Sequence, residues 1–496
     1  MRVLLINPKF PVSYWGMQHA LKFDGTRAVF PPLGLLTVSS LLPDYCESRL
    51  IDCEVEELKD RDIDNADLVF VTGMLVQKKA VHEVVNRCKA RGKTVVVGGP
   101  YVSTSMQDVP KADHIFVGEA ETTLPQFFED LMQGCPKRFY KAEKRPELTT
   151  LPLPHFRLAK LSRYSTMSIQ FSRGCPFDCE FCDIIEIYGR VPRTKTTTQV
   201  LAELDGLFSL GWRGSIFFVD DNFIGNKKTL RTLLPAIVKW QKNHEHPFVF
   251  FTQASLNLAD DESLLEQMRE AGFNTVFLGI ETPAEESLVE TQKLQNTRRN
   301  LLDSVRIIQS HGMEVMAGFI VGFDSDRPDI FQRQIEFIRQ SAIPRAMVGV
   351  LTALPDTKLW RRLDREGRLL GEGSGSNNEG LAGLNFVPKM DPHTLIGGHK
   401  SILRTIYAPR EYYERALESL KRTPLGSDHS GYKGLALVKG VAALARVIFY
   451  LGVLDAERLE FWRFMKRVVL EHHRHFAQGV KFAAMGYHFR TMRFSK

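Results

Sequence analysis

The sequence predicts an α/β protein in three parts: an N-terminal Rossmann-like, doubly wound sheet, a second series of β/α units, and a helical C-terminal domain. Short apolar runs alternate with amphipathic stretches over residues 1–135 and again over residues 166–390. Residues 136–165 are rich in Lys, Arg, Glu and Pro and predict a stiff linker between the two series. Apolar residues recur at helical spacing in residues 391–496, which predict the helical domain.

The composition is that of a globular protein. The 496 residues are 44% hydrophobic and 25% charged, enough for two or three domains. The first apolar run is short and broken by Asn7, so no signal peptide is predicted. Four of the seven cysteines are scattered, which indicates reduced thiols and a cytoplasmic protein. Residues 391–496 hold 18 Lys and Arg against 9 Asp and Glu, so the net charge of +7 arises from this region.

Five strands are predicted in the N-terminal part, at residues 2–6, 49–53, 67–72, 94–97 and 114–117, with helices at 35–42, 79–90 and 124–131. Ligands of such sheets bind outside the carboxyl ends of the strands. The candidate ligand contacts are therefore the residues that end these strands: Asn7, Thr72, Gly73, Met74, Gly98, Gly99, Gly118 and Glu119. No G-x-G-x-x-G follows the first strand, which argues against a dinucleotide.

The second series comprises six predicted strands, at residues 168–171, 215–219, 248–252, 275–279, 314–320 and 346–351. Helices are predicted between them, at residues 200–209, 230–241, 262–271, 300–310 and 330–340. In β/α barrels the chemistry takes place at the carboxyl ends of the strands, so polar residues there are candidates for the site.

Three cysteines at C-x₃-C-x₂-C spacing, Cys175, Cys179 and Cys182, carry the strongest chemical signal. Thiolates are soft ligands, and closely spaced cysteines on one loop suit an iron–sulfur cluster. Three ligands leave one iron of a four-iron cube open for a small molecule. Zinc is the alternative, but it needs a fourth ligand, and no Cys or His pair at zinc spacing lies nearby.

This motif, with Phe181 before the last cysteine, resembles the signature of the radical S-adenosylmethionine (SAM) superfamily. The resemblance implies a partial (β/α)₆ barrel, and a [4Fe–4S] cluster on which SAM is cleaved to a hydrogen-abstracting 5′-deoxyadenosyl radical. It implies SAM contacts at Phe181, Asp221, Gln253, Glu281 and Gly322. The superfamily's Gly-Gly-Glu is replaced here by Asp-Asp-Asn at residues 220–222. For these polar residues, a helix cap or a turn is the alternative interpretation.

The N-terminal pattern resembles the cobalamin-binding domain that precedes the barrel in many radical SAM enzymes. The D-x-H-x-x-G motif is absent, so the resemblance implies that no histidine need ligate cobalt. A Rossmann-like domain that binds nothing is the alternative. Arg190, Arg193 and Lys195 follow the cysteines and are predicted either to form a cationic lip over the cofactors or to lie in a solvated loop.

Residues 175–195 resemble a subgroup of cobalamin-dependent (class B) radical SAM enzymes, similar to hopanoid C-2 methylases and bacteriochlorophyllide C-methyltransferases. The resemblance implies methyl transfer from methylcobalamin to an unactivated carbon of a large apolar substrate, a hopanoid first and a bacteriochlorophyllide side chain next. It also implies an external electron donor of flavodoxin or ferredoxin type. A radical cyclase or rearrangement enzyme without methyl transfer, and a non-catalytic cobalamin or redox sensor, are the alternatives. No residue is assigned to the chemical step itself.

Helices are predicted in the C-terminal domain at residues 399–407 and 410–421. Residues 434–454 are strongly apolar, and one long helical pattern follows over residues 456–489. Basic residues fall between its apolar positions, which are Leu459, Trp462, Met465, Val469, Phe476, Val480 and Met485. Such a helix can lie on the inner membrane face or pack on the barrel with a basic outer side. No nucleic-acid-binding module is found. Residues 371–380 predict a lid or a loose connection.

Overall fold

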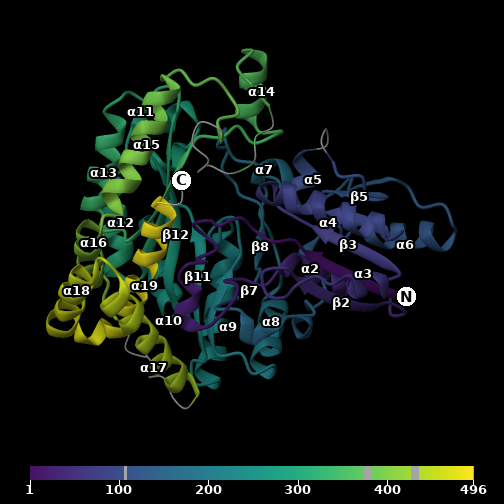
Figure 1. The fold of residues 1–496 in the computed structure, drawn as a ribbon, viewed down its shortest axis with the longest axis horizontal. Coiled ribbons are helices and arrows are strands. Elements are labelled where there is room, and N and C mark those ends of the chain that lie inside the picture. The colour runs from purple at the N-terminus through teal and green to yellow at the C-terminus, as the bar shows by residue number, and fades with distance from the viewer. Residues whose placement is uncertain (106–108, 372, 374, 376–382, 426–434, 495–496) are drawn as a thin grey trace.

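The computed structural model describes residues 1–105, 109–371, 373, 375, 383–425 and 435–494. Two six-stranded parallel sheets form the molecule, with the first on the right of Figure 1, the second near its centre, and the C-terminal helices on the left. The predicted α/β class is therefore confirmed. Most of the predicted lid, residues 371–380, lies outside the described residues.

The N-terminal sheet has the strand order β2-β1-β3-β4-β5-β6. Its strands are β1 Arg2–Asn7, β2 Glu47–Asp52, β3 Leu68–Thr72, β4 Thr94–Gly98, β5 His114–Val117 and β6 Phe139–Lys141. Its helices are α1 Leu21–Asp24, α2 Leu33–Ser40, α3 Asp60–Asp64, α4 Lys78–Ala90, α5 Pro100–Thr104 and α6 Leu124–Met132. The five predicted strands are present. The sixth, β6, pairs with β5 inside the range predicted to be a linker, so the sheet extends beyond residue 135.

Alternate residues of these strands enter two hydrophobic cores. Val3, Leu5 and Phe70 pack with α2 and α6 in a core that continues through the barrel and the C-terminal helices. Leu4 and Val71 pack with α3, α4 and α5 in a separate core. Side chains of a strand point alternately to opposite faces, so this division is the doubly wound arrangement. Sharing the first core fixes the N-terminal sheet against the barrel.

The second sheet has the strand order β14-β13-β12-β11-β10-β7, so that strands consecutive in the chain are neighbours. Its strands are β7 Met167–Ile169, β10 Gly214–Phe218, β11 Phe248–Ala254, β12 Phe273–Glu281, β13 Glu314–Val321 and β14 Arg345–Val350. The main helices are α8 Thr197–Ser209, α9 Lys227–Asn243, α10 Glu262–Ala271, α12 Leu301–Ser310 and α13 Ile330–Gln340. Shorter elements are β8 Ser172–Arg173, β9 Arg193–Thr194, α7 Ile184–Ile187, α11 Glu285–Glu290 and α14 Lys358–Arg365. Because β7 and β14 do not pair, the six β/α units form a partial barrel.

Aromatic side chains occupy the face of this sheet that points away from its covering helices. Phe217 and Phe251 are register partners whose rings stack at 4.5 Å, and Phe277 lies on the same face of the next strand. Two rings from the N-terminal part reach this layer: Phe30 lies 5.2 Å from Phe217, and Trp15 lies 4.8 Å from Phe277. These five residues, named here the aromatic layer, pack on one another on the inward face of the barrel sheet.

The C-terminal domain comprises α15 Pro392–Ile406, α16 Pro409–Arg422, α17 Leu435–Val447, the π-helix η8 Ile448–Leu454, α18 Arg458–Glu471 and α19 Phe476–Phe494. It covers the edge strand β14, whose outer carbonyl groups would otherwise lack partners. The Tyr407 hydroxyl donates to the Ala346 oxygen at 2.6 Å, and the His399 ring lies 2.9 Å from the Val348 oxygen. The domain is thus packed on the barrel.

The prediction of one long helical pattern over residues 456–489 is wrong, because the chain reverses at His473–His475. The apolar positions that suggested a single stripe lie on two faces: Leu459 is 67% exposed, whereas Met465 and Met485 are buried. Helical spacing continued across the turn, so periodicity alone could not show the reversal. A Cβ atom on Gly479 would lie 2.7 Å from Val468, so this glycine permits close packing of α19 on α18. Among the described residues, no helix has the length and apolar character that a membrane crossing requires.

Candidate cofactor site

The three cysteines lie on the loop between β8 and α7, which is closed on itself by backbone contacts. Gly174 has a φ of +99°, and a Cβ atom there would lie 2.8 Å from the Gly189 oxygen. The Cys175 N–H donates to that same oxygen at 3.2 Å, and the Cys182 N–H donates to the Cys179 oxygen at 3.2 Å. Only glycine fits the first turn, because its conformation and its close approach both exclude a side chain.

Amide groups point toward two of the three sulfur atoms. The Asn222 Nδ2 lies 3.8 Å from Cys175 Sγ, and the Gln295 Nε2 lies 3.6 Å from Cys179 Sγ. Hydrogen bonds to sulfur are among the groups that tune iron–sulfur clusters. Burial raises the pKa of the Cys175 and Cys182 thiols, so a bound metal would supply the positive charge that keeps them deprotonated.

The described residues contain no group of three His, Cys, Asp or Glu side chains that converges on a single metal ion. A cube binds its cysteines at separate corners, and therefore does not need such convergence. The sulfur-rich, nitrogen-donor surroundings of this loop fit a cluster with three protein ligands. They do not fit a closed zinc site, which requires four ligands around one ion.

Asp220 and Asp221 follow β10 and brace the start of the cysteine loop. Asp220 accepts hydrogen bonds from the Phe171 N–H at 3.1 Å and from the Ser172 hydroxyl at 2.5 Å. Asp221 accepts from the Gly174 N–H at 2.9 Å. Burial raises the pKa of Asp220 to about 7 and that of Asp221 to about 6. Asp220 is therefore engaged in bracing the loop, and Asp221 uses one carboxylate oxygen for the same purpose, a role that is neither the predicted SAM contact nor the alternative of a helix cap or a turn.

Glu281 ends β12 with a φ of +68° and a shift in strand register, and it pairs with Lys293 at 2.8 Å. The two side chains are only 8% and 12% exposed. Burial lowers the pKa of Lys293, but Glu281 and then Cys179 and Cys182 raise it by more, so the net shift is upward. A buried cation therefore lies beside the cysteines. Its Nζ is 5.9 Å from the centre of the Phe181 ring.

Lys293 and Gln295 were not predicted from the sequence, and Asn222 was singled out only as part of the Asp-Asp-Asn run, without its contact to Cys175. Lys293 and Gln295 follow β12 in a segment without apolar periodicity, and the Glu180 N–H holds this segment to the cysteine loop through the Thr291 oxygen at 2.9 Å. Such a contact between distant segments leaves no local pattern. The sequence of a β/α barrel does predict that polar residues after each strand approach one another, and that signal was available for Asn222.

Gln253 and Gly322 lie at the carboxyl ends of β11 and β13, the two neighbours of β12. In the described part of the chain, the half-buried Gln253 side chain makes no hydrogen bond. Gly322 has a φ of +105°, and its N–H donates to Asp326 at 2.8 Å. The strand-end residues predicted to contact SAM therefore gather at one end of the barrel, the end that carries the cysteine loop.

The residues predicted to contact cobalamin end four parallel strands, β1, β3, β4 and β5, at one rim of the N-terminal sheet. Asn7 donates to Asp52 at 3.0 Å, so its side chain is already engaged. Gly99 has a φ of +98°, and a Cβ atom there would lie 2.4 Å from Thr72 Oγ1. Gly73, Gly98 and Gly118 share this rim, and Met74 is 52% exposed on it. The rim therefore offers mainly backbone to a ligand.

Glu119 differs from the other rim residues, because its carboxylate forms ion pairs with two arginines of the barrel. Arg173 contacts Glu119 and Glu121, each at 2.7 Å, and Arg193 contacts Glu119 at 2.8 Å. These four side chains, named here the rim bridge, are 4–11% exposed. A ligand contact by the Glu119 side chain is therefore not supported by the geometry. The bridge binds the N-terminal rim to the residues just before Cys175.

The predicted cationic lip is not formed. Arg193 belongs to the rim bridge, and Lys195 is buried in an ion pair with Glu203. Only Arg190 is largely exposed, at 55%, next to Asp178. The helices α5, which follows the rim, and α7, which follows the cysteines, are in contact and lie side by side in Figure 1. The rim and the cysteine loop therefore face each other.

Three family models match successive parts of the chain. The "B12 binding domain" model matches residues 26–128, and the "Radical SAM superfamily" model matches residues 169–338. A "Domain of unknown function (DUF4070)" matches residues 357–495. A solved structure of the radical SAM methyltransferase TsrM from Kitasatospora setae, with cobalamin and a [4Fe–4S] cluster, has the same fold: the TM-score is 0.66 at 14% identity, over 98% of this chain and 99% of that one.

Curated relatives match most of the chain. An uncharacterised methyltransferase of Synechocystis sp. is 43% identical over 93% of this chain and 86% of its own length. The hopanoid C-2 methylase of Rhodopseudomonas palustris is 37% identical over 94% and 89%. The bacteriochlorophyllide d C-12(1)-methyltransferase of Chlorobaculum tepidum is 27% identical over 73% and 78%. The chain therefore belongs to the cobalamin-dependent radical SAM methyltransferases, with a [4Fe–4S] cluster, SAM and cobalamin as its cofactors.

Proposed function

We propose that this enzyme methylates an unactivated carbon of a large apolar small molecule, and that the substrate is a hopanoid methylated at C-2. The aromatic layer carries the proposal, because its five rings form one apolar layer on the inward face of the barrel sheet, and four of the rings are partly exposed. Such a surface suits a fused-ring lipid, which is held by burial rather than by hydrogen bonds. The likeness to a hopanoid C-2 methylase along nearly the whole chain supports the same substrate.

The cofactors, when bound, supply a hydrogen-abstracting radical and a methyl group. The chain's own residues position the reactants. Cys175, Cys179 and Cys182 hold the cluster, and the polar residues around them, Lys293, Glu281 and Gln253, hold the amino-acid and ribose parts of SAM. The backbone of the N-terminal rim holds the corrin. The aromatic layer holds the substrate between them and excludes water.

Lys293 provides a test of the SAM contact. Replacing it with methionine is expected to weaken SAM binding about tenfold to hundredfold, because a charge-assisted hydrogen bond contributes roughly 1.5–3 kcal/mol. The measurement is the change in the electron paramagnetic resonance spectrum of the reduced cluster as SAM is added. Lys228→Met, on an exposed lysine of α9, is the matched control. An unchanged titration in a Lys293→Met variant that keeps its full iron content would contradict the assignment.

A bacteriochlorophyllide side chain is the second candidate substrate. A flat tetrapyrrole also suits an aromatic surface, and a bacteriochlorophyllide methyltransferase is among the relatives. This likeness covers less of the chain and is lower in identity than the likeness to the hopanoid methylase.

The deciding experiment is anaerobic turnover of the reconstituted enzyme with SAM, methylcobalamin and dithionite, offering a desmethyl hopanoid and a bacteriochlorophyllide separately. We expect the hopanoid to gain about 14 Da, the mass of one CH₂ group, together with S-adenosylhomocysteine and 5′-deoxyadenosine. Methylation of the tetrapyrrole alone would reverse the order of the two substrates. A product of altered ring structure and unchanged carbon number would instead identify a radical cyclase.

The proposal includes a low-potential electron donor of flavodoxin or ferredoxin type. Its support is α14, which lies on the cysteine loop: Lys358 contacts Asp178 at 2.5 Å, and Arg361 contacts Glu186 at 2.6 Å. Half of the Arg361 side chain remains exposed. Cations at this position suit the docking of an acidic carrier close to the cluster. We also propose that the enzyme works as a peripheral protein on the inner membrane face, and that the C-terminal helices make the contact.

A further inference from the structure

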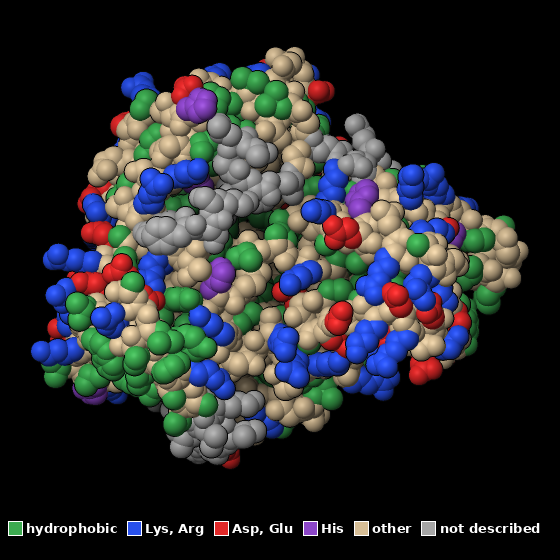
Figure 2. All heavy atoms as spheres, viewed as in Figure 1, with side chains coloured by type: hydrophobic (Ala, Val, Ile, Leu, Met, Phe, Trp, Pro, Cys, Tyr) green, Lys and Arg blue, Asp and Glu red, His purple; other side chains and the backbone are tan. Residues whose placement is uncertain are grey.

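The exposed hydrophobic side chains of the molecule are concentrated in one short region. Of the 22 large hydrophobic residues that are exposed in the described chain, nine lie within residues 441–470. Figure 2 shows them gathered at the lower left, over α17 and α18. Leu470, Leu459 and Leu454 are the most exposed, at 69%, 67% and 60%. Scattered exposed apolar residues are ordinary, but a contiguous group marks an interaction site.

This surface, named here the apolar patch, spans several helices rather than one. On α18, Leu459, Trp462 and Val469 follow one another at intervals of three and seven residues, so they share one side of the helix. The opposite side of α18 is also apolar and is buried: Phe464 stacks on Tyr413 at 4.5 Å. The Trp462 indole N–H donates to the Gly452 oxygen of η8 at 2.9 Å. This bond connects the part of the patch on α18 to the part on η8. An ordinary amphipathic helix would carry polar residues on the exposed side.

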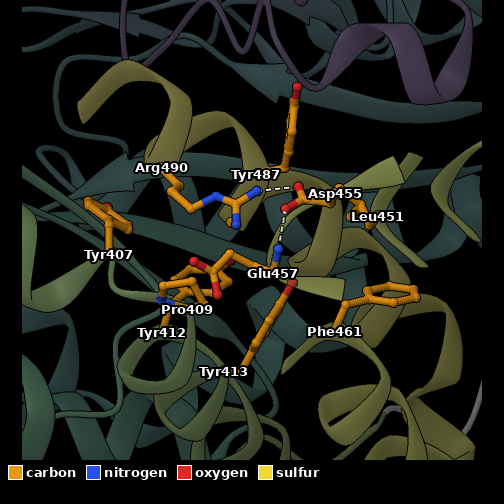
Figure 3. A pocket seen from close by; sticks show the side chains of 11 residues that line it. Tyr407, Pro409, Tyr412, Tyr413, Leu451, Asp455, Glu457, Phe461, Tyr487 and Arg490 are labelled. Carbon is orange, nitrogen blue, oxygen red and sulfur yellow. Dashed lines mark hydrogen bonds and ion pairs between the residues drawn. The ribbon is translucent and has the colours of Figure 1, made fainter. Parts of the chain in front are cut away.

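Contacts beneath the patch fix the turn between η8 and α18. Arg490 of α19 holds Asp455 in the turn between η8 and α18, and Asp455 in turn accepts from the Glu457 N–H at 2.8 Å (Figure 3). The space between these residues and the tyrosines around them is about 10 Å³, room for one water molecule at most. It is therefore a packed joint and no ligand site. The exposed rings and leucines are held outward by the fold.

Positive charge surrounds the patch. Within residues 455–475, three acidic side chains are already paired: Asp455 with Arg490, Glu460 with Arg463, and Glu471 with Arg467. In this described stretch, exposed Arg458, Lys466 and Arg474 have no ion-pair partner, and only Glu457 remains to oppose them. A second copy of the chain would bring these like charges together, whereas anionic headgroups would neutralise them.

We propose that the apolar patch docks the enzyme on a bilayer with anionic headgroups, with its leucines and Phe449 in the acyl boundary and its cations among the headgroups. Trp462 and Tyr450 suit the boundary, because their rings are apolar and carry one polar atom. The inference deepens the proposed function and rests on it for its purpose, which is to reach a substrate that resides in the membrane. Docking itself does not depend on the identity of the substrate.

The test measures sedimentation of the full-length, cofactor-loaded enzyme with vesicles of phosphatidylcholine, with and without phosphatidylglycerol. We expect binding to vesicles that contain phosphatidylglycerol, and we expect salt to weaken it. Leu454→Ser and Leu459→Ser should each reduce the partition constant by about tenfold or more, as the loss of a buried leucine implies. Leu210→Ser, on an exposed leucine at the end of α8, is the matched control and should bind as the wild type does.

Absence of vesicle binding would overturn the inference. Binding that these serine variants do not weaken would overturn it also, as would a dimer that forms through the patch in place of vesicle binding. A measurement of methylation activity distinguishes a failure of membrane docking from a failure of the proposed function. The serine variants should methylate detergent-dispersed hopanoid at the wild-type rate and lose only vesicle-embedded substrate. If the enzyme binds vesicles but methylates no hopanoid, the docking surface is supported and the proposed substrate is wrong.

Discussion

Replacing Cys179 with alanine is expected to remove the cluster and to reduce the formation of 5′-deoxyadenosine at least about a thousandfold, the scale on which loss of an essential group acts. Cys179 is the buried member of the three cysteines, and Gln295 contacts its sulfur. Two thiolates cannot hold a cube that already has one iron without a protein ligand. The measurements are iron and sulfide content after anaerobic reconstitution, the absorption of the cluster, and 5′-deoxyadenosine formed with SAM and dithionite.

Cys135→Ala is the matched control, because this thiol is exposed and lies between α6 and β6 of the N-terminal sheet. It should retain the cluster and the activity of the wild type. A Cys179→Ala protein that reconstitutes to the full iron content and still cleaves SAM would show that another residue binds the cluster. The same protein should keep its cobalamin, because the rim and the cysteine loop belong to different sheets.

The sequence predicted the strands of both sheets well because strands buried on both faces are short, continuous apolar runs between turns. The ends of α10 and α13 were predicted to the residue. For α10 the reason is plain, because the helix lies between the N-cap Asp261 and the left-handed Gly272. The elements that were missed are short. β6, β8 and β9 contain two or three residues each, and each depends on pairing with a strand outside its own segment. The helices α11 and α14 were also not predicted, and they have six and eight residues.

The candidate site divides in the same way. The spacing of the cysteines is local, so the sequence alone could indicate it. The Glu281–Lys293 pair depends on a strand end with a positive φ and on Gly279, where a Cβ atom would lie 2.3 Å from Glu281 Oε1. The sequence predicted that Glu119 reaches the rim, but not that Arg173, 54 positions away, occupies its carboxylate. The order of the strands determines which residues lie near one another, and the sequence can predict this. Which charged side chain pairs with which depends on the packing of the folded protein.

The apolar patch shows a third case. Hydrophobic and basic residues at helical spacing predicted an amphipathic surface, and the sequence left membrane contact and packing as alternatives. Both faces of α18 turn out to be apolar: Phe461 and Val468 are buried, while Leu459 and Trp462 are exposed. Because apolar residues occur on both sides of the helix, their spacing in the sequence could not separate the residues that are buried from those that are exposed.

The rim bridge leads to the second prediction of large effect. Arg173→Met should lower the free energy of unfolding by about 3–5 kcal/mol, because removal of one partner leaves buried carboxylates without compensation. Burial lowers the pKa of Arg173, but Glu121 and Glu119 raise it by more, so the arginine is charged in the folded protein. Arg193 remains, but of the two carboxylates of the rim bridge it pairs with Glu119 and not with Glu121. The measurement is urea denaturation of the anaerobic enzyme, and Arg306→Met, in an exposed pair with Asp303, should leave the unfolding curve unchanged.

A further variant separates the loss of charge balance from the loss of packing. Buried ion pairs replaced as a unit by apolar residues are often neutral or stabilising, so Glu119→Met and Glu121→Met in the Arg173→Met background should restore most of the lost stability. The same triple variant is expected to bind cobalamin and the cluster but to couple them poorly: 5′-deoxyadenosine should form without an equal amount of methylated product. The bridge is the buried ionic contact that links the cobalamin rim to the residues before Cys175. Full stability in Arg173→Met, or equal product and 5′-deoxyadenosine in the triple variant, would show that the bridge does not hold the two cofactor sites in register.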